Sequence, residues 1–340
     1  TGIAIAKDEA RITLEGAPDQ PGSSHALFSS LATSGIAVDM IIQNVGQGGR
    51  ADISFTVPES DLTNALDCTE RVASQIAADG VSHDHGVSKV SIVGMGMADA
   101  EGVAGQVFTS LSEKKINVHM ITTSEIKISV LVDRSDGPAA VRAAHTTFDL
   151  EKSLGEAHLD SEQHADLPKS SPLEVVQRLN GMEDLAIEDC LLDSSQALIT
   201  FIDLPDTPGV AAEVFDEVGR AGLSVDMIVQ SHPRQGQAEI SFTVPAENCE
   251  SARSVAKKIA SSRNAKVVDV PAVAKLSITG VGIRSHAGVA NKLFTPLSDA
   301  GINIDLVSTS EVRLNVIVSA QNGKHSLHVL RNAFGLDIGS

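Results

Sequence analysis

Two short stretches of the sequence combine an aspartate with a turn that could bind a free amino acid. Asp-x-Pro-Gly occurs at 19–22 and again at 206–209. Each turn lies between a strand-like and a helix-like stretch, where free backbone N–H groups and the helix dipole favour a carboxylate. Gly22 and Gly209 lack a Cβ, so a ligand can approach the backbone closely. The simpler interpretation is a bare turn with the aspartate as a cap.

Further polar residues follow each turn at the same spacing. Asp39 and Asp226 open the next strand-like stretch and could pair with an ammonium group. Gln43 and Gln230 lie four residues on, on the same face of a strand, and can both donate and accept hydrogen bonds. A free amino acid needs a site for its own carboxylate and, beside it, a protein carboxylate that can pair with its ammonium group. Because the full set recurs, we favour binding over a bare turn.

Other candidate motifs are weaker. His83-Asp84-His85 has no suitably spaced third ligand for a metal, and we expect a loop. Gln47-Gly48-Gly49-Arg50 lacks the Gly-Lys-Ser/Thr ending of a phosphate loop. No nucleophile elbow is apparent. We therefore predict no catalytic residue and no metal site in this chain.

An internal repeat organises the elements around these motifs. Val-Asp-Met-Ile-(Ile/Val)-Gln begins at Val38 and Val225, and Ile-Ser-Phe-Thr-Val-Pro begins at Ile53 and Ile240, both at an offset of 187 residues. A weaker repeat inside each half relates 39–41 to 119–121 and 226–228 to 305–307. The chain therefore reads as four units of about 80 residues.

Each unit shows the order βαββα plus a closing strand. Alternating apolar residues indicate the strands, and apolar residues at helical spacing indicate the helices. Two helices on one face of an antiparallel sheet is a ferredoxin-like α+β fold. We predict two tandem pairs in which the first unit is inserted into the second. The expected boundaries are 7–86 for the first unit, 1–6 with 87–152 for the second, 195–272 for the third, 181–194 with 273–340 for the fourth, and 153–180 for a solvated linker.

Composition limits the partners and the compartment. The formal charge of −18 makes nucleic acid and membrane surfaces poor partners. The three cysteines are far apart and odd in number, which suits reduced thiols in a cytoplasm. No apolar run has the length of a membrane span.

These motifs together resemble the regulatory region of aspartate kinases, which is built from ACT domains. The matching text is Asp-x-Pro-Gly, Val-Asp-Met-Ile-(Ile/Val)-Gln, Ile-Ser-Phe-Thr-Val, Lys-(Val/Leu)-Ser-Ile-x-Gly and Thr-Ser-Glu-(Ile/Val). The resemblance implies feedback inhibition by lysine, threonine or both, bound where ACT domains pair. Such kinases convert aspartate and ATP to aspartyl phosphate. The kinase signature Lys-x-Gly-Gly-Thr is absent here, so ATP and magnesium are expected only in a separate catalytic domain. The doubled pair looks like the variant with four ACT domains.

The resemblance also implies the effector contacts. In the first half they are Asp19, Gly22, Ser24, Asp39 and Gln43, closed by Asn117 and Val118; in the second half they are Asp206, Gly209, Ala211, Asp226 and Gln230, closed by Asn303 and Ile304. The second unit departs from the family pattern, because Asp99 and Glu101 would repel a carboxylate. The fourth unit keeps Arg284 and His286, which can accept an anion. We expect ligand on the cradles of the first and third units.

Two alternatives and one assembly prediction complete the interpretation. A free-standing amino-acid sensor or separate regulatory subunit would carry the same motifs without a kinase domain. A hydrolase or other enzyme would need a catalytic cluster that we do not find. Because sheet edges need covering, we also expect the chain to form a homo-oligomer through its ACT units.

Overall fold

The computed structural model describes residues 2–44, 48–94, 102–124, 126–149, 186–281, 283, 288–310 and 313–336. The predicted linker at 153–180 lies outside this part. So do the acidic residues Asp99 and Glu101 and the pair Arg284 and His286.

Each half of the chain repeats one order of elements. The first half contains β1 (Gly2–Pro18), α1 (Ser23–Thr33), β2 (Ile41–Gln43), β3 (Arg50–Pro58), α2 (Leu62–Ile76), β4 (Gly80–Val93), α3 (Val103–Glu113), β5 (Met120–Ser124), β6 (Lys127–Asp133) and α4 (Gly137–Thr147). The second half contains β7 (Ala186–Pro205), α7 (Val210–Arg220), β8 (Ile228–Gln230), β9 (Gln237–Pro245), α8 (Cys249–Arg263), β10 (Lys266–Val281), α9 (Val289–Asp299), β11 (Leu306–Thr309), β12 (Arg313–Ser319) and α10 (Gly323–Phe334). The predicted α+β class with repeated βαββαβ units is confirmed.

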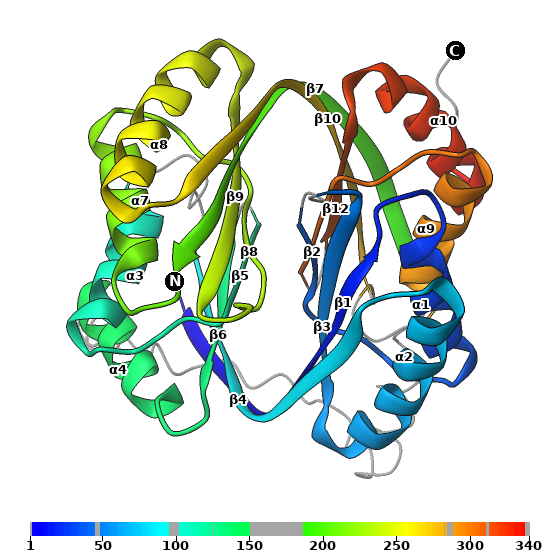
Figure 1. Cartoon of the computed structure of the whole chain (residues 1–340), viewed down its shortest axis with the longest axis horizontal. Coiled ribbons are helices and arrows are strands. Elements are labelled where there is room, and N and C mark those ends of the chain that lie inside the picture. Colours follow the sequence, from blue (N-terminus) through cyan, green and yellow to red (C-terminus); the bar gives the residue numbers. More distant parts are fainter. Residues whose placement is uncertain are drawn as a thin grey trace, which may run out of the picture.

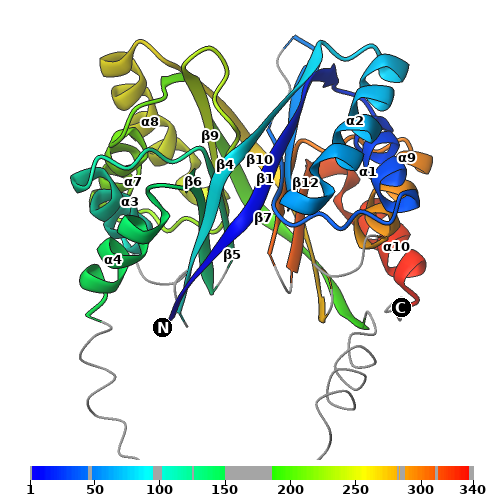
Figure 2. The same cartoon turned by 90° about the horizontal axis from the view of Figure 1, so that it is seen from below.

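Four long strands each serve two units. The start of β1, Gly2 to Ala6, pairs with Val93 to Lys89 of β4, in the sheet of the second unit. The later part of β1 pairs with β3 of the first unit. In Figure 2, β1 and β4 run together from the layer that carries α3 and α4 to the layer that carries α1 and α2. Strands β7 and β10 do the same for the third and fourth units. Each of these long strands therefore continues from the sheet of one unit into the sheet of the next.

The units pair across the two halves. Strand β2 of the first unit pairs with β11 of the fourth, through Gln43 with Val307 and Ile42 with Ser308. Strand β5 of the second unit pairs with β8 of the third, through Ile121 with Gln230 and Thr122 with Val229. The strands close in the order β1-β3-β2-β11-β12-β10-β7-β9-β8-β5-β6-β4.

This closure removes the reason that we gave for self-association. The described strands form a continuous ring of pairings, so they present no free sheet edge for a second copy to cover. A homo-oligomer stays a prediction, and it would have to use the outer helices or the loops.

The helices cover the outer faces of the flattened barrel. Figure 1 shows α1, α2, α9 and α10 on one side and α3, α4, α7 and α8 on the other. Phe28 of α1 stacks on Phe294 of α9 with ring centroids 4.8 Å apart, and Phe108 of α3 lies 5.3 Å from Phe215 of α7. None of the described helices has the length and apolar character to cross a membrane.

Two apolar cores lie under the outer helices, and a third lies inside the flattened barrel, between its two faces. It contains one residue from the same position of each unit, Met40, Met120, Met227 and Leu306, together with their neighbours. Burying both faces of the sheets explains the near-continuous apolar character of the strands.

Candidate functional site

The two cradles lie at two interfaces between units. We call the contact of units one and four the A interface and the contact of units two and three the B interface. At A, helix α1 packs beside α9; at B, helix α3 packs beside α7. Gly22 and Gly209 precede α1 and α7 with φ angles of 103° and 99°, which side chains with a Cβ rarely adopt. The Asp-x-Pro-Gly turns therefore set the start of both helices.

At the B interface, a pocket lies between the start of α7 and the segment before β5. Its lining is Phe108, Ile116, Asn117, Val118, Pro205, Asp206, Thr207, Pro208, Gly209, Val210, Ala211, Ala212, Gln230, Ala238 and Ile240. Asn117 Nδ2 donates to Asp206 Oδ1 at 3.0 Å. Gln230 Nε2 donates to the carbonyl oxygen of Val118 at 2.7 Å.

Gln230 is the most suggestive polar group in this pocket. The residue is 4% exposed, and no hydrogen bond to its oxygen Oε1 is found within the described part of the chain, although this atom is not fully enclosed. An acceptor without a donor at a pocket wall fits an ammonium or hydroxyl group of a ligand.

At the A interface the same contacts recur with one addition. Asn303 Nδ2 donates to Asp19 Oδ1 at 2.8 Å, and Gln43 Nε2 donates to the carbonyl oxygen of Ile304 at 2.8 Å. Here Ser24 Oγ also donates to Gln43 Oε1 at 2.6 Å. The third unit has Ala211 at the position of Ser24, so Gln230 lacks this donor.

The predicted pairing of cradle and wall is therefore wrong. We expected Asn117 and Val118 to close the first cradle, but they close the one at Asp206. Asn303 and Ile304 close the cradle at Asp19 instead. The reason is physical: the edge of β2 meets β11, not β5, so each cradle faces the other half of the chain.

Asp39 and Asp226 each have a cation from the chain itself. Lys89 forms an ion pair with Asp39, and Lys275 forms one with Asp226. A ligand ammonium would have to displace a lysine. Sequence reasoning missed these lysines, although a lone lysine in an apolar strand, repeated 186 residues later, was a usable signal.

Register shows that this cation position and this acid position exist in all four units. The cation position pairs across the sheet with Thr56, Leu131, Thr243 and Ile317, and holds Arg11, Lys89, Leu198 and Lys275 respectively. The acid position donates its backbone N–H to the carbonyl oxygens of those four partners, and holds Asp39, His119, Asp226 and Asp305 respectively. Each lysine pairs with the acid position of the other unit in its own half.

The two remaining combinations are mismatched. Arg11 has His119 at the matching acid position, and burial lowers the pKa of Arg11 to about 10, against the charges of Asp84 and Glu15. Asp305 has Leu198 at the matching cation position. Burial, with a smaller contribution from the charge of Asp19, raises the pKa of Asp305 to about 6. Arg11 therefore has no carboxylate at its matching position, and Asp305 has no cation at its matching position.

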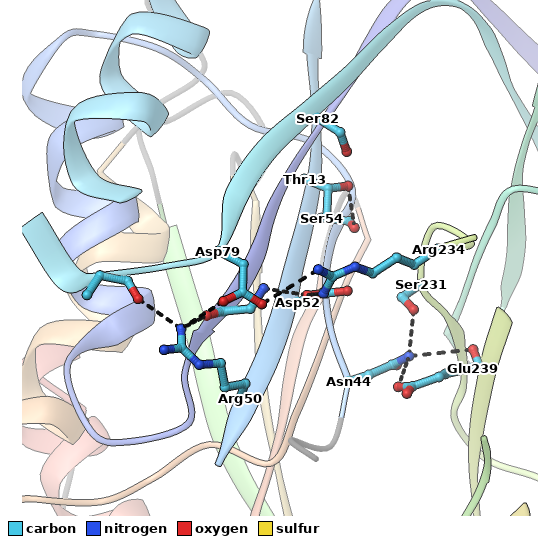
Figure 3. A network of polar contacts seen from close by, with 12 residues as sticks. Thr13, Asn44, Arg50, Asp52, Ser54, Asp79, Ser82, Ser231, Arg234 and Glu239 are labelled. Carbon is cyan, nitrogen blue, oxygen red and sulfur yellow. Dashed lines mark hydrogen bonds and ion pairs between the residues drawn. The ribbon is translucent and has the colours of Figure 1, made fainter. Parts of the chain in front are cut away.

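A polar network joins units one and three at one end of the barrel. In Figure 3, Arg234 reaches across to Asp52 and Asp79, at 3.9 and 3.6 Å, and Arg50 lies 3.3 Å from Asp79. Burial raises the pKa of Asp52. Asn44 Nδ2 donates to Ser231 Oγ at 2.7 Å in the same view. The two arginines, Arg50 and Arg234, balance the charges of Asp52 and Asp79, which fits a contact between units. Among the residues described, no group of three or more His, Cys, Asp or Glu is placed to hold a metal ion.

Known proteins identify the units. A profile described as the ACT domain matches residues 12–71, 90–148 and 276–334, and a second ACT profile matches residues 198–264. The chain belongs to the ACT-domain family. Each of its four units is thus an ACT domain, and the A and B interfaces are contacts between ACT domains.

The relatives of these ACT domains are aspartate kinases. The aspartokinase of Pseudomonas aeruginosa is 42% identical over 151 residues, which are 44% of this chain and 37% of that protein. The regulatory subunit of aspartate kinase from Thermus thermophilus is 34% identical over 44% of this chain and 99% of its own, with a TM-score of 0.42. The crystal structure of aspartate kinase from Synechocystis matches the whole chain with a TM-score of 0.86 and 29% identity, and the match covers 56% of that protein.

The match to the Pseudomonas enzyme and the whole-chain match to the Synechocystis structure confirm the resemblance to an aspartokinase regulatory region. The chain spans less than two fifths of the length of the Pseudomonas relative. It therefore corresponds to one region of such an enzyme.

Proposed function

We propose that the four ACT domains bind lysine, threonine or both at the A and B interfaces and so control an aspartate kinase catalytic domain. That domain would convert aspartate and ATP to 4-phospho-aspartate for amino-acid biosynthesis in the cytoplasm. ATP and magnesium would belong to it, and not to these units. A regulatory subunit made apart from its kinase domain is the second candidate, and the 34% identity to such a subunit over nearly its full length favours it.

The observation that carries the proposal is the pocket beside Gln230. The N–H groups at the start of α7 suit the carboxylate of a free amino acid. The oxygen of Gln230 and the carboxylate of Asp206 suit its ammonium group. The A interface offers the same set through Gln43 and Asp19, once Ser24 gives up its hydrogen bond.

A ligand would shift the equilibrium by binding one arrangement of each interface more tightly. It would displace the Asn117–Asp206 and Asn303–Asp19 hydrogen bonds, which hold the cradle to the opposing unit. Replacing these contacts changes how α1 sits beside α9 and how α3 sits beside α7. That change is what an attached catalytic domain would sense.

Calorimetric titration of the whole chain with lysine and with threonine tests this function. We expect Gln230→Ala to weaken one binding event and Gln43→Ala to weaken the other, each by about tenfold or more, as expected for a hydrogen bond to a charged group. Gln196→Ala is the matched control, because Gln196 is equally buried and lies outside both cradles. A parent chain that binds neither amino acid would refute the proposal.

A further inference from the structure

Arg11 is a buried guanidinium whose hydrogen bonds go to neutral groups. The residue is 3% exposed, and its Nη1 donates to two hydroxyl groups, Thr13 Oγ1 at 2.7 Å and Ser82 Oγ at 3.5 Å. Its Nε is enclosed and has no hydrogen bond within the described residues, and none is found there for Nη2, which is not fully enclosed. A guanidinium has five N–H donors, and a buried charge is normally paired. Arg11 therefore retains donors that a negatively charged group could accept.

The equivalent positions show what a cation at this place normally contacts. Lys89 forms an ion pair with Asp39, and the second half of the chain repeats this pair. Because units one and two carry equivalent positions, His119 lies opposite Arg11 as Asp39 lies opposite Lys89. His119 supplies an imidazole where the other units have a carboxylate, and its Nδ1 is buried without a hydrogen bond within the described residues. The cation of this pair is kept, and its acid is replaced by a histidine.

The carboxylates nearest in the sheet do not replace that acid. Asp84 faces Arg11 across the pairing of β1 and β4, but its Oδ1 accepts a backbone N–H at 2.7 Å. The charges of Asp84 and Glu15 raise the pKa of Arg11 less than burial lowers it, and neither acid forms an ion pair with Arg11 in the part of the chain that the structure describes. Glu9, two residues before Arg11, lies 4.0 Å from Lys89.

Neutral donors surround the guanidinium. In Figure 3, Thr13, Ser54 and Ser82 lie together on one wall, and Thr13 Oγ1 is 2.8 Å from Ser54 Oγ. The ring of His232 lies beside that of His119, with centroids 6.1 Å apart, and its Nδ1 is also buried without a hydrogen bond among the residues described. Burial lowers the pKa of His232 to about 3, so its imidazole is neutral and carries one N–H. Hydroxyl and imidazole N–H groups can all donate to an anion.

We propose that Arg11 binds a small inorganic anion such as chloride, which takes the place that the carboxylate of Asp39 takes beside Lys89. The deep burial of Arg11 restricts the site to a small ion, which contacts Nη2 directly. None of these residues belongs to the cradle at Asp19 or to the one at Asp206. The site therefore goes beyond the proposed function and does not depend on whether the chain binds amino acids.

The stability of the whole chain in chloride and in gluconate, at equal ionic strength, tests this site. Gluconate is too large to reach Arg11. We expect the urea midpoint of the parent to rise when chloride replaces gluconate, because an ion that binds only the native state stabilises it. Arg11→Leu, which copies Leu198 of the third unit, should remove this rise. His119→Asp supplies the acid that the other three units have, and it should remove the rise as well.

An exposed arginine of α4 provides the matched control, since Arg142→Leu should keep the full effect of chloride. In crystals soaked in bromide, anomalous scattering should place an ion beside the guanidinium of Arg11 in the parent. A parent midpoint that is equal in both salts would overturn the proposal, and so would an equal rise in the parent and in Arg11→Leu. A bromide-soaked crystal of the parent without an ion at Arg11 would also overturn it.

Discussion

The ion pair between Lys275 and Asp226 gives a sharp test of what holds the two sheets together. The side chains are 11% and 24% exposed, so both charges are largely removed from water. Removing one partner of a buried pair costs about 3–5 kcal/mol, because the other charge stays buried. The remaining exposure of Asp226 puts Asp226→Ala at the lower end, about 3 kcal/mol of unfolding free energy. Since this carboxylate already has a cation, we expect stability, more than ligand affinity, to suffer.

The equivalent pair in the first half provides a matched control. Lys89 and Asp39 are more deeply buried, but Lys89 also lies 4.0 Å from Glu9, whose side chain is 6% exposed. At the position of Glu9 the third unit has the neutral Gln196. Lys275 also interacts with the charge of Asp193, but that carboxylate is only partly buried and already accepts hydrogen bonds from Ser195 and Gln196. Asp39→Ala therefore leaves the lysine with a second carboxylate, and we expect a smaller loss, about 1–2 kcal/mol.

The double variant Asp226→Ala/Lys275→Met completes the argument. Leu198 shows that an apolar residue is accommodated at the cation position. Removing both charges should therefore return the stability to within about 1 kcal/mol of the parent. Urea unfolding, with the midpoint and slope measured for each variant, gives the comparison. The reasoning is refuted if Asp226→Ala costs less than about 0.5 kcal/mol, or if the double variant is as unstable as the single one.

Three further predictions concern single side chains. Burial and Asp19 raise the pKa of Asp305 from 3.8 to about 6, so the folded state loses stability as the pH rises through that value. At about 1.4 kcal/mol per pKa unit, Asp305→Asn should gain about 3 kcal/mol at pH 8 and almost nothing at pH 4, and equal effects in urea unfolding at both pH values would contradict this. Phe294→Ala removes the ring stacked on Phe28 and should cost about 3–5 kcal/mol in the same assay; a loss near zero would mean that α1 and α9 do not pack as described. Burial raises the pKa of Cys190 to about 12 and all three cysteines are buried, so a thiol reagent at pH 8 should modify the unfolded chain only, and rapid labelling of the native chain would count against the packing.

Much of the fold could be predicted because the evidence for it is local. The alternation of Ile12 and Leu14, the glycine before α1 and the proline that ends β3 each act within a few residues. Duplication then repeats that evidence at a fixed offset. The cradle could be predicted for the same reason, since a turn before a helix is defined by its own sequence.

The choice of partners could not be predicted in this way. Strands β2, β5, β8 and β11 carry similar apolar patterns, so each could pair with any of the other three. Which pairing forms depends on how the long strands cross between sheets, a property of the whole chain. The same limit hid the lysines opposite Asp39 and Asp226, because their contacts join strands about 50 residues apart.

The crossed pairing has a consequence for how the molecule is made. Unit two can pair with unit three once the chain has been synthesised through β8 and β9. Unit one must wait for α9 and β11, which belong to the last of the four units in sequence order. Until then Phe28, which also contacts Phe55 of its own unit, lacks its stacking partner Phe294, and the outer edge of β2 lacks β11. Neighbouring nascent chains on one messenger RNA carry the same incomplete first unit, so an exchange of first units between two copies is the error of synthesis that this topology permits.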